Sequence, residues 1–349
     1  MTIVADIYQF VVGVDTHAAT HTFAVLDAGS GQVLATDTFP TSPAGLKRAL
    51  AWIGRRTPGE TLLVVEGIGS YGAGIAAAAG RAGYPVVEPF PTPARLRRGQ
   101  GKSDTLDAAR IADSVRGVDT TRLRQPRCDE PIRQALRVLV DVRETITVNR
   151  TRQINQLTAL LRSINLGVDA RKTITTPQIR AIAAWRTPPN TDPAGIIRAE
   201  ATRLARHILA ANQELADNLN LLRALITTHP ARFLLDLPGV GPVTAATIIT
   251  TWSHPGRIRS DAAFASLAGV SPIPASSGNT IRYRLNRGGD RRLNRAITTI
   301  VRVRLAHDPR TRAYRDTHIA QGKTPREIER VLKRYIARDI YRQLTAHMI

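Results

Sequence analysis

The stretch VVGVDTHAATHTFAVLD, residues 11–27, decides the fold at the start of the chain. The apolar residues before Asp15 and the run 22–26 after it predict the two strands of a β-hairpin. Asp15 places a bare carboxylate in a strand that otherwise has the composition of a core. Burying an unpaired carboxylate is strongly unfavourable, so this residue predicts a charged partner nearby.

The composition indicates a large globular protein. The chain has 349 residues, 43% of them hydrophobic, which is enough for two or three domains with their own cores. No apolar run reaches the length of about 18 residues that predicts a membrane span, and no cleavable signal pattern is present. We therefore expect a cytoplasmic protein without membrane contact. Cys128 is the only cysteine, which excludes an internal disulfide and a cysteine-based zinc site.

The charge balance predicts a polyanionic partner. Lys and Arg number 49 against 28 Asp and Glu, giving a net charge of +21 and a pI near 11.3. This excess favours nucleic acid over a membrane surface, and most of the basic residues are Arg, which can contact phosphate through two hydrogen bonds. A GC-rich genome would also raise the Arg content, but this bias alone does not explain the shortage of Asp and Glu.

Residues 1–125 predict an α/β domain. Three strand patterns are followed by alternating helix and strand patterns, with Ser42 and Ser103 as N-caps of the first and last helices. The predicted strands cover 8–15, 21–28, 31–39, 61–67 and 84–90, and the predicted helices cover 42–56, 71–83 and 103–117.

The middle of the chain, residues 126–230, predicts two long helices. One covers 129–166, and the other carries apolar residues at three- and four-residue spacing over 197–226, as in a coiled coil. A Thr- and Pro-rich connector, 170–195, separates them. The pair predicts an antiparallel arm or a dimer interface, and ordinary packing of two helices within one chain is the alternative. Residues 231–349 predict a mostly helical C-terminal domain.

Three further carboxylates are candidate companions of Asp15. Glu66 ends the apolar run TLLVVEG, and Asp104 and Asp107 share one face of the helix that begins after Ser103. Their convergence would require divalent cations, and oxygen ligands suit Mg²⁺ or Mn²⁺, with two ions able to polarise a phosphodiester. The alternative is that Glu66 is a solvated strand end and that the two aspartates interact only with the helix dipole.

An opening strand with a central Asp is shared by the RNase H-like nucleases and the actin-like kinases and ATPases. The kinase interpretation needs a Gly-rich turn after Asp15 and a second phosphate loop containing Asp-Gly-Gly. The turn here is THAATH and no such second loop exists. The sequence therefore favours the RNase H-like fold.

The stretch LDLPGVGPVTAATI, residues 235–248, predicts a helix-hairpin-helix. Gly239 and Gly241 would let the hairpin backbone approach a DNA phosphate, beside the free N–H groups of the next helix. The alternative is a glycine-containing turn between helices.

Ser276 and Ser277 lie in the Pro-, Ser- and Gly-rich loop that follows. The stretch 281–306 after them holds eight Arg and one Asp. A hydroxyl in such a basic field could attack a phosphodiester, although a loop serine is more often a turn residue.

Taken together, the whole chain resembles the DEDD transposases of bacterial insertion sequences, a family described as bridge-RNA-guided recombinases. The matching stretches, in the family's order, are VGVDTHAATHTFAVLD, VVEGIGSYG, KSDTLDAARIA, LPGVGPVTAATI, FASLAGVSPIPASSGN and RGGDRRLNRAI. The resemblance implies a RuvC-like (RNase H fold) N-terminal domain and a C-terminal transposase domain, joined by coiled-coil helices. It also implies a metal tetrad made of Asp15, Glu66, Asp104 and Asp107.

The resemblance further implies that a serine directly before a glycine joins to a DNA 5′-phosphate and frees a 3′-OH. This serine would be Ser277, with Ser276 as the alternative. The covalent bond would conserve the energy of the cut strand, so no nucleotide cofactor is expected. The expected partners are donor and target DNA, a guide RNA and further copies of the chain in a dimer or tetramer, acting at the nucleoid. The residues expected to contact nucleic acid are Lys102, Gly239, Gly241, Arg282, Arg284, Arg287, Arg291 and Arg292.

Two rival hypotheses remain open. A RuvC-like junction resolvase would use water as its nucleophile and leave Ser277 outside the chemistry. A non-catalytic nucleic-acid-binding protein would use its carboxylates only to cap strands and helices.

Overall fold

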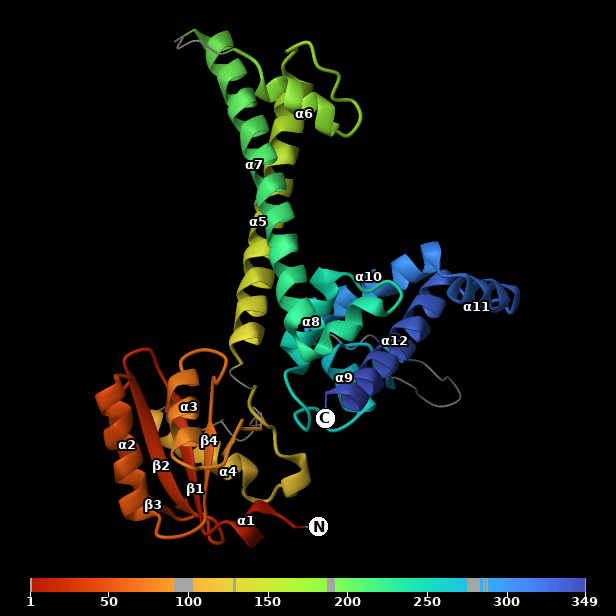
Figure 1. Ribbon diagram of the computed structural model, residues 1–349. Helices are drawn as coiled ribbons and strands as arrows, with labels where there is room; N and C mark the ends of the chain where they lie inside the picture. Colours follow the sequence, from red (N-terminus) through yellow and green to blue (C-terminus); the bar gives the residue numbers. More distant parts are fainter. Residues whose placement is uncertain are drawn as a thin grey trace. The chain divides into compact units, whose positions relative to one another are not determined.

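The computed structural model describes residues 2–90, 103–127, 130–186, 192–274, 283–284, 286 and 288–348 (Figure 1). The chain divides into two compact units. The first unit comprises Met1–Asp129 and Ser253–Ala263, and the second comprises Glu130–Trp252 and Phe264–Ile349. The boundaries expected near residues 125 and 230 remain predictions.

The first unit is built on a mixed β-sheet. Its strands are β1 (Phe10–Thr16), β2 (Thr20–Asp27), β3 (Val33–Pro40), β4 (Thr61–Val65) and β5 (Val86–Val87), in the order β3-β2-β1-β4-β5. β1 is antiparallel to β2, and β2 to β3, whereas β1, β4 and β5 run parallel. This mixed α/β sheet is consistent with the predicted RNase H-like fold. The expected strand over 84–90 is short, with only two residues in β5.

Helices cover both faces of this sheet (Figure 1). The helices of this unit are α1 (Val4–Ile7), α2 (Pro43–Arg56), α3 (Ala73–Arg81) and α4 (Asp104–Arg116), with a 3₁₀ turn, η2 (Thr120–Arg122). α4 packs on one face through Ala108, Ile111, Ala112 and Val115, and α2 and α3 pack on the other. Ser42 and Ser103 accept hydrogen bonds at the starts of α2 and α4, which confirms both predicted N-caps.

β1 is buried from both sides, and its alternation sorts its side chains between two cores. Val12 and Val14 face α2 and α3, whereas Val11 faces α4. Asp15 continues the alternation of Val11 and Gly13 and therefore belongs to the α4 face. The charged partner expected for Asp15 must therefore come from α4 or from the loops next to it.

The second unit contains the two predicted long helices, α5 (Pro131–Ser163) and α7 (Pro193–Thr228). They lie side by side and antiparallel (Figure 1), since Arg143 bonds Asn218 at 3.2 Å while Arg150, further along α5, bonds the earlier Asn212. The expected connector between them contains a short helix, α6 (Thr176–Ala183), which the sequence analysis missed. The regular coiled-coil register remains a prediction.

The rest of the second unit is mostly helical. Its elements are η3 (Pro230–Asp236), α8 (Pro242–Trp252), α9 (Asp261–Leu267), β6 (Ile273–Pro274), β7 (Tyr283–Arg284), α10 (Arg291–His307), α11 (Pro309–Ala320) and α12 (Pro325–His347). α9 begins in the segment that is assigned to the first unit. Among the described helices, none combines the length and apolar character that crossing a bilayer requires.

Candidate active site

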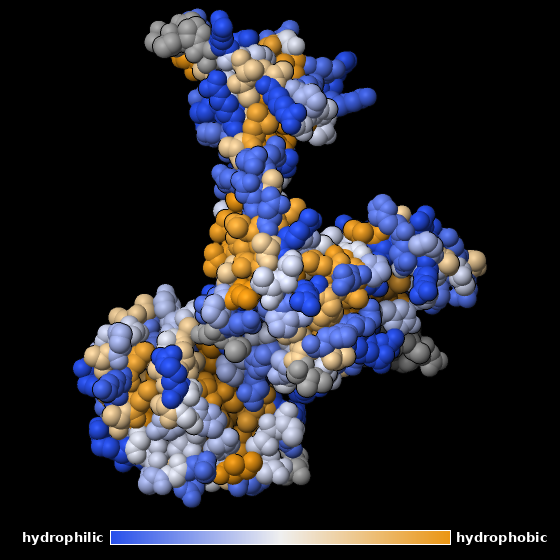
Figure 2. All heavy atoms as spheres, viewed as in Figure 1, coloured by the Kyte–Doolittle hydropathy of each residue, from blue (hydrophilic) through white to orange (hydrophobic). Residues whose placement is uncertain are grey.

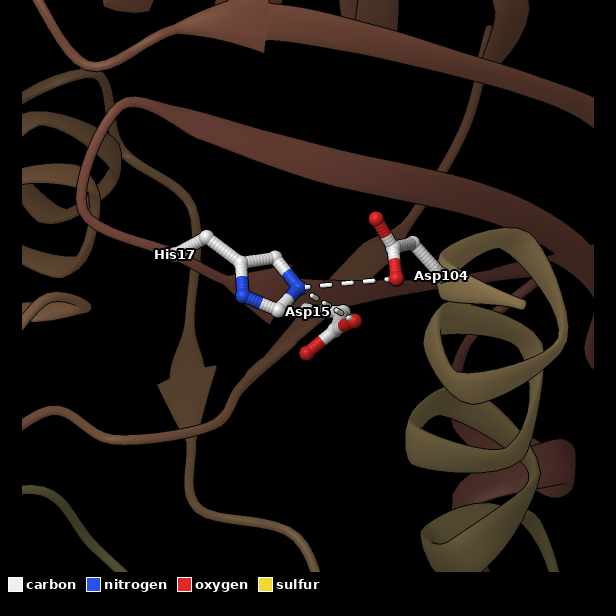
Figure 3. A group of neighbouring side chains, drawn as sticks. All are labelled: Asp15, His17 and Asp104. Atoms are coloured by element: carbon white, nitrogen blue, oxygen red, sulfur yellow. Dashed lines mark hydrogen bonds and ion pairs between the residues drawn. The ribbon is translucent and has the colours of Figure 1, made fainter. Parts of the chain in front are cut away.

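A small polar cluster forms at the end of β1 in the first unit (Figure 3). It consists of Asp15 from β1, His17 from the β1–β2 turn and Asp104 from the first residue of α4, and their ligand atoms lie within 4.8 Å of one another. The structure therefore brings together two of the four predicted carboxylates, Asp15 and Asp104. His17 is a member that the sequence analysis did not identify.

His17 lies between the two carboxylates. Its Nε2 is 3.2 Å from an Asp15 oxygen and 3.6 Å from an Asp104 oxygen. The Asp15 side chain is only 12% exposed, whereas those of His17 and Asp104 are about half exposed. The site is thus open to solvent on one side and anchored by a buried carboxylate on the other.

Burial raises the pKa of Asp15 above its ordinary value. The neighbouring His17 opposes this rise, and the negative charges of Asp104 and Asp107 add to it. Asp104 and Asp107 therefore place negative charge near the buried Asp15 carboxylate, and a cation bound among the three would be stabilised.

Asp107 lies one turn further along α4 and is already engaged. Its carboxylate accepts a hydrogen bond from Arg110 at 2.8 Å. It contributes to the field at Asp15 but lies outside the three-residue group.

Glu66 follows β4 directly and is held beside β1 through its backbone. Its N–H donates to the Val14 carbonyl at 3.2 Å, and its own carbonyl accepts from the Thr16 hydroxyl at 3.1 Å. Gly72 packs so closely that a Cβ there would lie 2.3 Å from the Glu66 carbonyl oxygen. The Glu66 side chain is exposed and outside the three-residue group. Its backbone position next to Asp15 is thus fixed, although its carboxylate does not join the cluster.

The donor set fits a divalent metal ion. Carboxylate oxygens suit Mg²⁺ and Mn²⁺, and an imidazole nitrogen is better suited to Mn²⁺ than to Mg²⁺. The chemistry of Asp15, His17 and Asp104 therefore fits such an ion.

The predicted serine loop belongs to the second unit. Ser276 and Ser277 lie outside the described residues, as do Lys102, Arg282 and Arg287. The antiparallel strands β6 and β7 pair on either side of this loop, through Ile273–Arg284 and Pro274–Tyr283. The described chain thus fixes where the loop begins and ends.

The other five predicted nucleic-acid contacts lie in described parts of the second unit, and one of them, Arg284, ends β7. Gly239 has a φ of +78° and packs against α10, where a Cβ would meet the Ile300 carbonyl at 3.0 Å. Gly241 has open space around it and donates its N–H to the Thr244 hydroxyl. The positive φ and the packing against α10 together account for a glycine at 239. The helix-hairpin-helix remains a prediction.

Arg291 and Arg292 begin α10. Arg291 is exposed, whereas Arg292 forms ion pairs with Asp141 and Glu144 of α5. The Asp290 carboxylate accepts hydrogen bonds from the backbone of Arg292 and Leu293, so it caps the helix. Arg292 therefore holds α10 to α5 in the described structure, and its predicted phosphate contact would have to compete with two carboxylates.

The mixed sheet and the acidic group at the end of β1 are consistent with the class of metal-dependent enzymes that have an RNase H-like fold. Comparison with known families makes this specific. A transposase family model matches residues 12–166, and the model described as "Transposase IS116/IS110/IS902 family" matches residues 231–316. The chain belongs to the IS110 family of transposases.

Individual relatives agree with this assignment. The chain is 27% identical over 277 residues to the 43.6 kDa protein of insertion element IS110 from Streptomyces coelicolor, covering 66% of this chain and 67% of the relative. It is 25% identical over 295 residues to the 42 kDa protein of insertion element IS900 from Mycobacterium paratuberculosis, covering 72% and 73%. The predicted identification as a DEDD transposase is thereby confirmed.

Proposed function

We propose that this transposase cuts and rejoins DNA strands through a covalent bond between Ser277 and a DNA 5′-phosphate, at a metal site held by Asp15 and Asp104. The observation that carries the proposal is the approach of these two carboxylates at the end of β1, with His17 between them. Glu66 and Asp107 complete the proposed set of acidic ligands. When bound, Mg²⁺ or Mn²⁺ would polarise the scissile phosphate and stabilise its developing charge.

In the proposed reaction, the Ser277 hydroxyl oxygen attacks the scissile phosphorus. The new Oγ–P bond forms as the bond from phosphorus to the 3′ oxygen breaks, and the hydroxyl proton passes to solvent while the leaving oxygen takes up a proton. The products are a 5′-phosphoserine and a free 3′-OH. A 3′-OH from another strand reverses the step and releases Ser277, so the exchange needs no nucleotide cofactor.

The same proposal includes the partners of the reaction. The protein would act on DNA in the cytoplasm as a homodimer or tetramer, and a guide RNA would choose the DNA target sites. The net charge of +21 supports binding of long nucleic acids. Apolar side chains gather on the α5–α7 pair (Figure 2), where Val138, Val142 and Leu221 are each about half exposed. Such a surface supports self-association.

Covalent trapping tests the chemistry directly. Purified protein with its co-purified RNA, Mg²⁺ and labelled donor-end DNA is resolved on a denaturing gel. We expect a protein–DNA adduct in the wild type and in Ser276→Ala, and none in Ser277→Ala or Asp15→Asn. Asp27→Asn is the matched control, because Asp27 ends β2 and its carboxylate accepts hydrogen bonds from Ser30 in the turn that follows.

Two results would contradict the serine mechanism. Nicked DNA without an adduct, unchanged in Ser277→Ala, would favour the water-using resolvase. Tight DNA binding without any cleavage, even with Mg²⁺ or Mn²⁺, would favour a non-catalytic binding protein.

A further inference from the structure

A pocket of about 320 Å³ lies between α10, α11 and α12 in the second unit. Leu332 and Ile336 form its apolar floor, and both are buried. Most of its other lining residues are charged or polar. The helix α12 that supplies most of them lies beyond residue 316, outside both segments that match the transposase family models.

Three arginines and one acid line this pocket. The arginines are Arg304 from α10 and Arg338 and Arg342 from α12, and the acid is Asp339. Neither Arg338 nor Arg342 has a carboxylate within ion-pair distance among the residues that the structure describes. The pocket therefore carries an uncompensated positive charge.

The Arg304 guanidinium is held by a backbone carbonyl. Its Nε donates to the Pro238 carbonyl at 2.7 Å, which fixes its orientation, and its side chain is only 15% exposed. Its Nη2 is buried without a hydrogen-bond partner and lies 3.8 Å from the nearest Asp339 oxygen. Asp339 and Asp308 offset part of the Arg304 charge, so the positive charge of the pocket comes mainly from Arg338 and Arg342.

An exposed aromatic ring borders the same pocket. Tyr335 is 44% exposed, and the Arg338 guanidinium lies 5.2 Å from its ring centre. The ring of Tyr314 in α11 packs edge to face against the Tyr335 ring, with the two ring centres 6.1 Å apart. Proteins that bind single-stranded nucleic acids combine arginines with exposed aromatic rings. The arginines contact the phosphates, and a base stacks against the ring.

The surrounding surface has the same sign of charge. Residues 302–342 contain 12 Lys and Arg against five Asp and Glu. Figure 2 shows mostly hydrophilic side chains over α11 and α12 on the visible face. This field would attract a polyanion toward the pocket.

We propose that the α10–α11–α12 pocket binds one phosphodiester group of a single-stranded nucleic acid, with the adjoining base against Tyr335. The site goes beyond the proposed strand exchange, since it shares no residue with the acidic cluster or the serine loop. DNA and RNA offer the same phosphodiester, so the experiment distinguishes the two sources.

The test measures binding of the full chain to fluorescein-labelled single-stranded DNA and to RNA of the same sequence over a series of salt concentrations. The variant is Arg338→Gln/Arg342→Gln. Its matched control is Arg326→Gln/Arg330→Gln, which removes the same charge from exposed positions of α12 outside the pocket. We expect the pocket variant to bind at least about tenfold more weakly and the control to change by less than about twofold. The slope of log affinity against log salt should become shallower by about 0.7 for the one lost phosphate contact.

A loss with DNA alone or with RNA alone would identify the source, and either result supports the site. Equal losses in both double variants would overturn the proposal, because the binding would then depend only on the overall charge. The proposal would also be overturned if millimolar inorganic phosphate displaced the labelled oligonucleotide equally well whatever its sequence or sugar, because the pocket would then bind only a free anion.

A second measurement does not depend on the folding of the arginine variants. Oligonucleotides that carry 4-thiothymidine or 4-thiouridine are crosslinked to the wild-type chain by light, and the crosslinked peptide is mapped by mass spectrometry. We expect a crosslink at Tyr335 that excess unlabelled oligonucleotide removes. Crosslinks that lie wholly outside α10–α12 would overturn the proposal. The covalent-adduct assay is scored separately, so failure of this site and failure of the proposed chemistry are distinguishable.

Discussion

Gly13 of β1 lies directly beneath Ala108 of α4. A Cβ at position 13 would be 2.0 Å from the Ala108 carbonyl oxygen and 2.6 Å from the Ala112 nitrogen. The helix can therefore rest on the strand only because this residue is glycine. Asp104 begins the same helix and Asp15 follows two residues later in the same strand, so this contact brings the two carboxylates together.

Replacing Gly13 by Ala should therefore damage the site as well as the core. Pushing α4 away from β1 is expected to cost about 1–3 kcal/mol, as in other overpacked cores. The midpoint of thermal unfolding should fall, and the rise in this midpoint on adding Mn²⁺ should shrink because Asp104 no longer approaches Asp15. Gly74→Ala is the matched control, since a Cβ there would meet only Leu46 at an ordinary 3.6 Å. An unchanged response to Mn²⁺ in Gly13→Ala would contradict this linkage.

Much of the first unit was predictable because its signals are local. The hairpin followed from the apolar residues on either side of Asp15, and the starts of α2 and α4 followed from Ser42 and Ser103. The two long helices followed from their apolar spacing. Their packing against each other within one chain was among the possibilities that the sequence left open, beside a dimer interface.

Other features depend on contacts that a linear pattern does not reveal. α6 lies in a Thr- and Pro-rich stretch, and its buried Ile179 and Ile182 pack in one core with Leu157 of α5 and Ala201 of α7. Its capping box, Thr175 with Gln178, was a signal in the sequence that could have located it. The predicted approach of Gly239 to a phosphate stays a prediction, and its φ of +78° with its close packing against α10 gives a second reason for glycine there.

His17 was missed for a similar reason. A histidine two residues after an acidic strand residue was a weak signal, because its relation to Asp104 depends on where α4 begins. The sequence therefore predicted the two carboxylates that the structure brings together, Asp15 and Asp104, but not the imidazole between them.

His17 should be a ligand of a bound Mn²⁺ ion, because its Nε2 already lies within 3.6 Å of both clustered carboxylates. Electron spin-echo spectroscopy of the Mn²⁺-loaded chain should show coupling to an imidazole ¹⁴N nucleus, and His17→Ala should remove it. Mn²⁺ should then bind about tenfold more weakly, and Mg²⁺ should be affected less, because Mg²⁺ prefers oxygen ligands.

The control for this experiment is His207→Gln, which removes an exposed imidazole from α7. It should leave both the nitrogen coupling and the Mn²⁺ affinity unchanged. Coupling that persists in His17→Ala would show that another imidazole holds the ion.

Glu144 should stabilise the contact between α5 and α10. It accepts hydrogen bonds from Arg292 at 2.7 Å and Arg295 at 3.0 Å, and these bonds, chiefly the one from Arg295, lower the pKa of its carboxyl group. Because the three side chains are between 31% and 67% exposed, water and salt screen the network. Glu144→Gln should therefore cost only about 0.5–1 kcal/mol.

The signature of this ion-pair network is its dependence on salt. The stability difference between the wild type and Glu144→Gln should shrink in 1 M NaCl, where the Debye length is about 3 Å. Glu214→Gln, an exposed position on α7, should have no comparable effect at either salt concentration. A difference that is equally large in high salt would indicate packing rather than charge.

His229 should make the stability of the second unit sensitive to acid. The ring is 1% exposed, and its Nδ1 accepts a hydrogen bond from the Ala231 N–H at 3.0 Å, which requires the neutral form. Burial lowers the pKa of His229 below its ordinary value of about 6.5, and the facing Glu130 carboxylate at 3.5 Å opposes this only in part. The contribution of the neutral ring is thus fully present above pH 6.5 and is lost as the pH falls toward the lower folded pKa.

His229→Asn separates titration from packing. The Asn side-chain oxygen can accept the same Ala231 hydrogen bond as an N-cap, but it does not titrate. We expect this variant to be less stable at pH 8, because a buried ring is lost, and to lose less further stability than the wild type between pH 6.5 and pH 5. Urea unfolding followed by circular dichroism at these three pH values measures both effects. Parallel losses in the two proteins would mean that other groups cause the acid sensitivity.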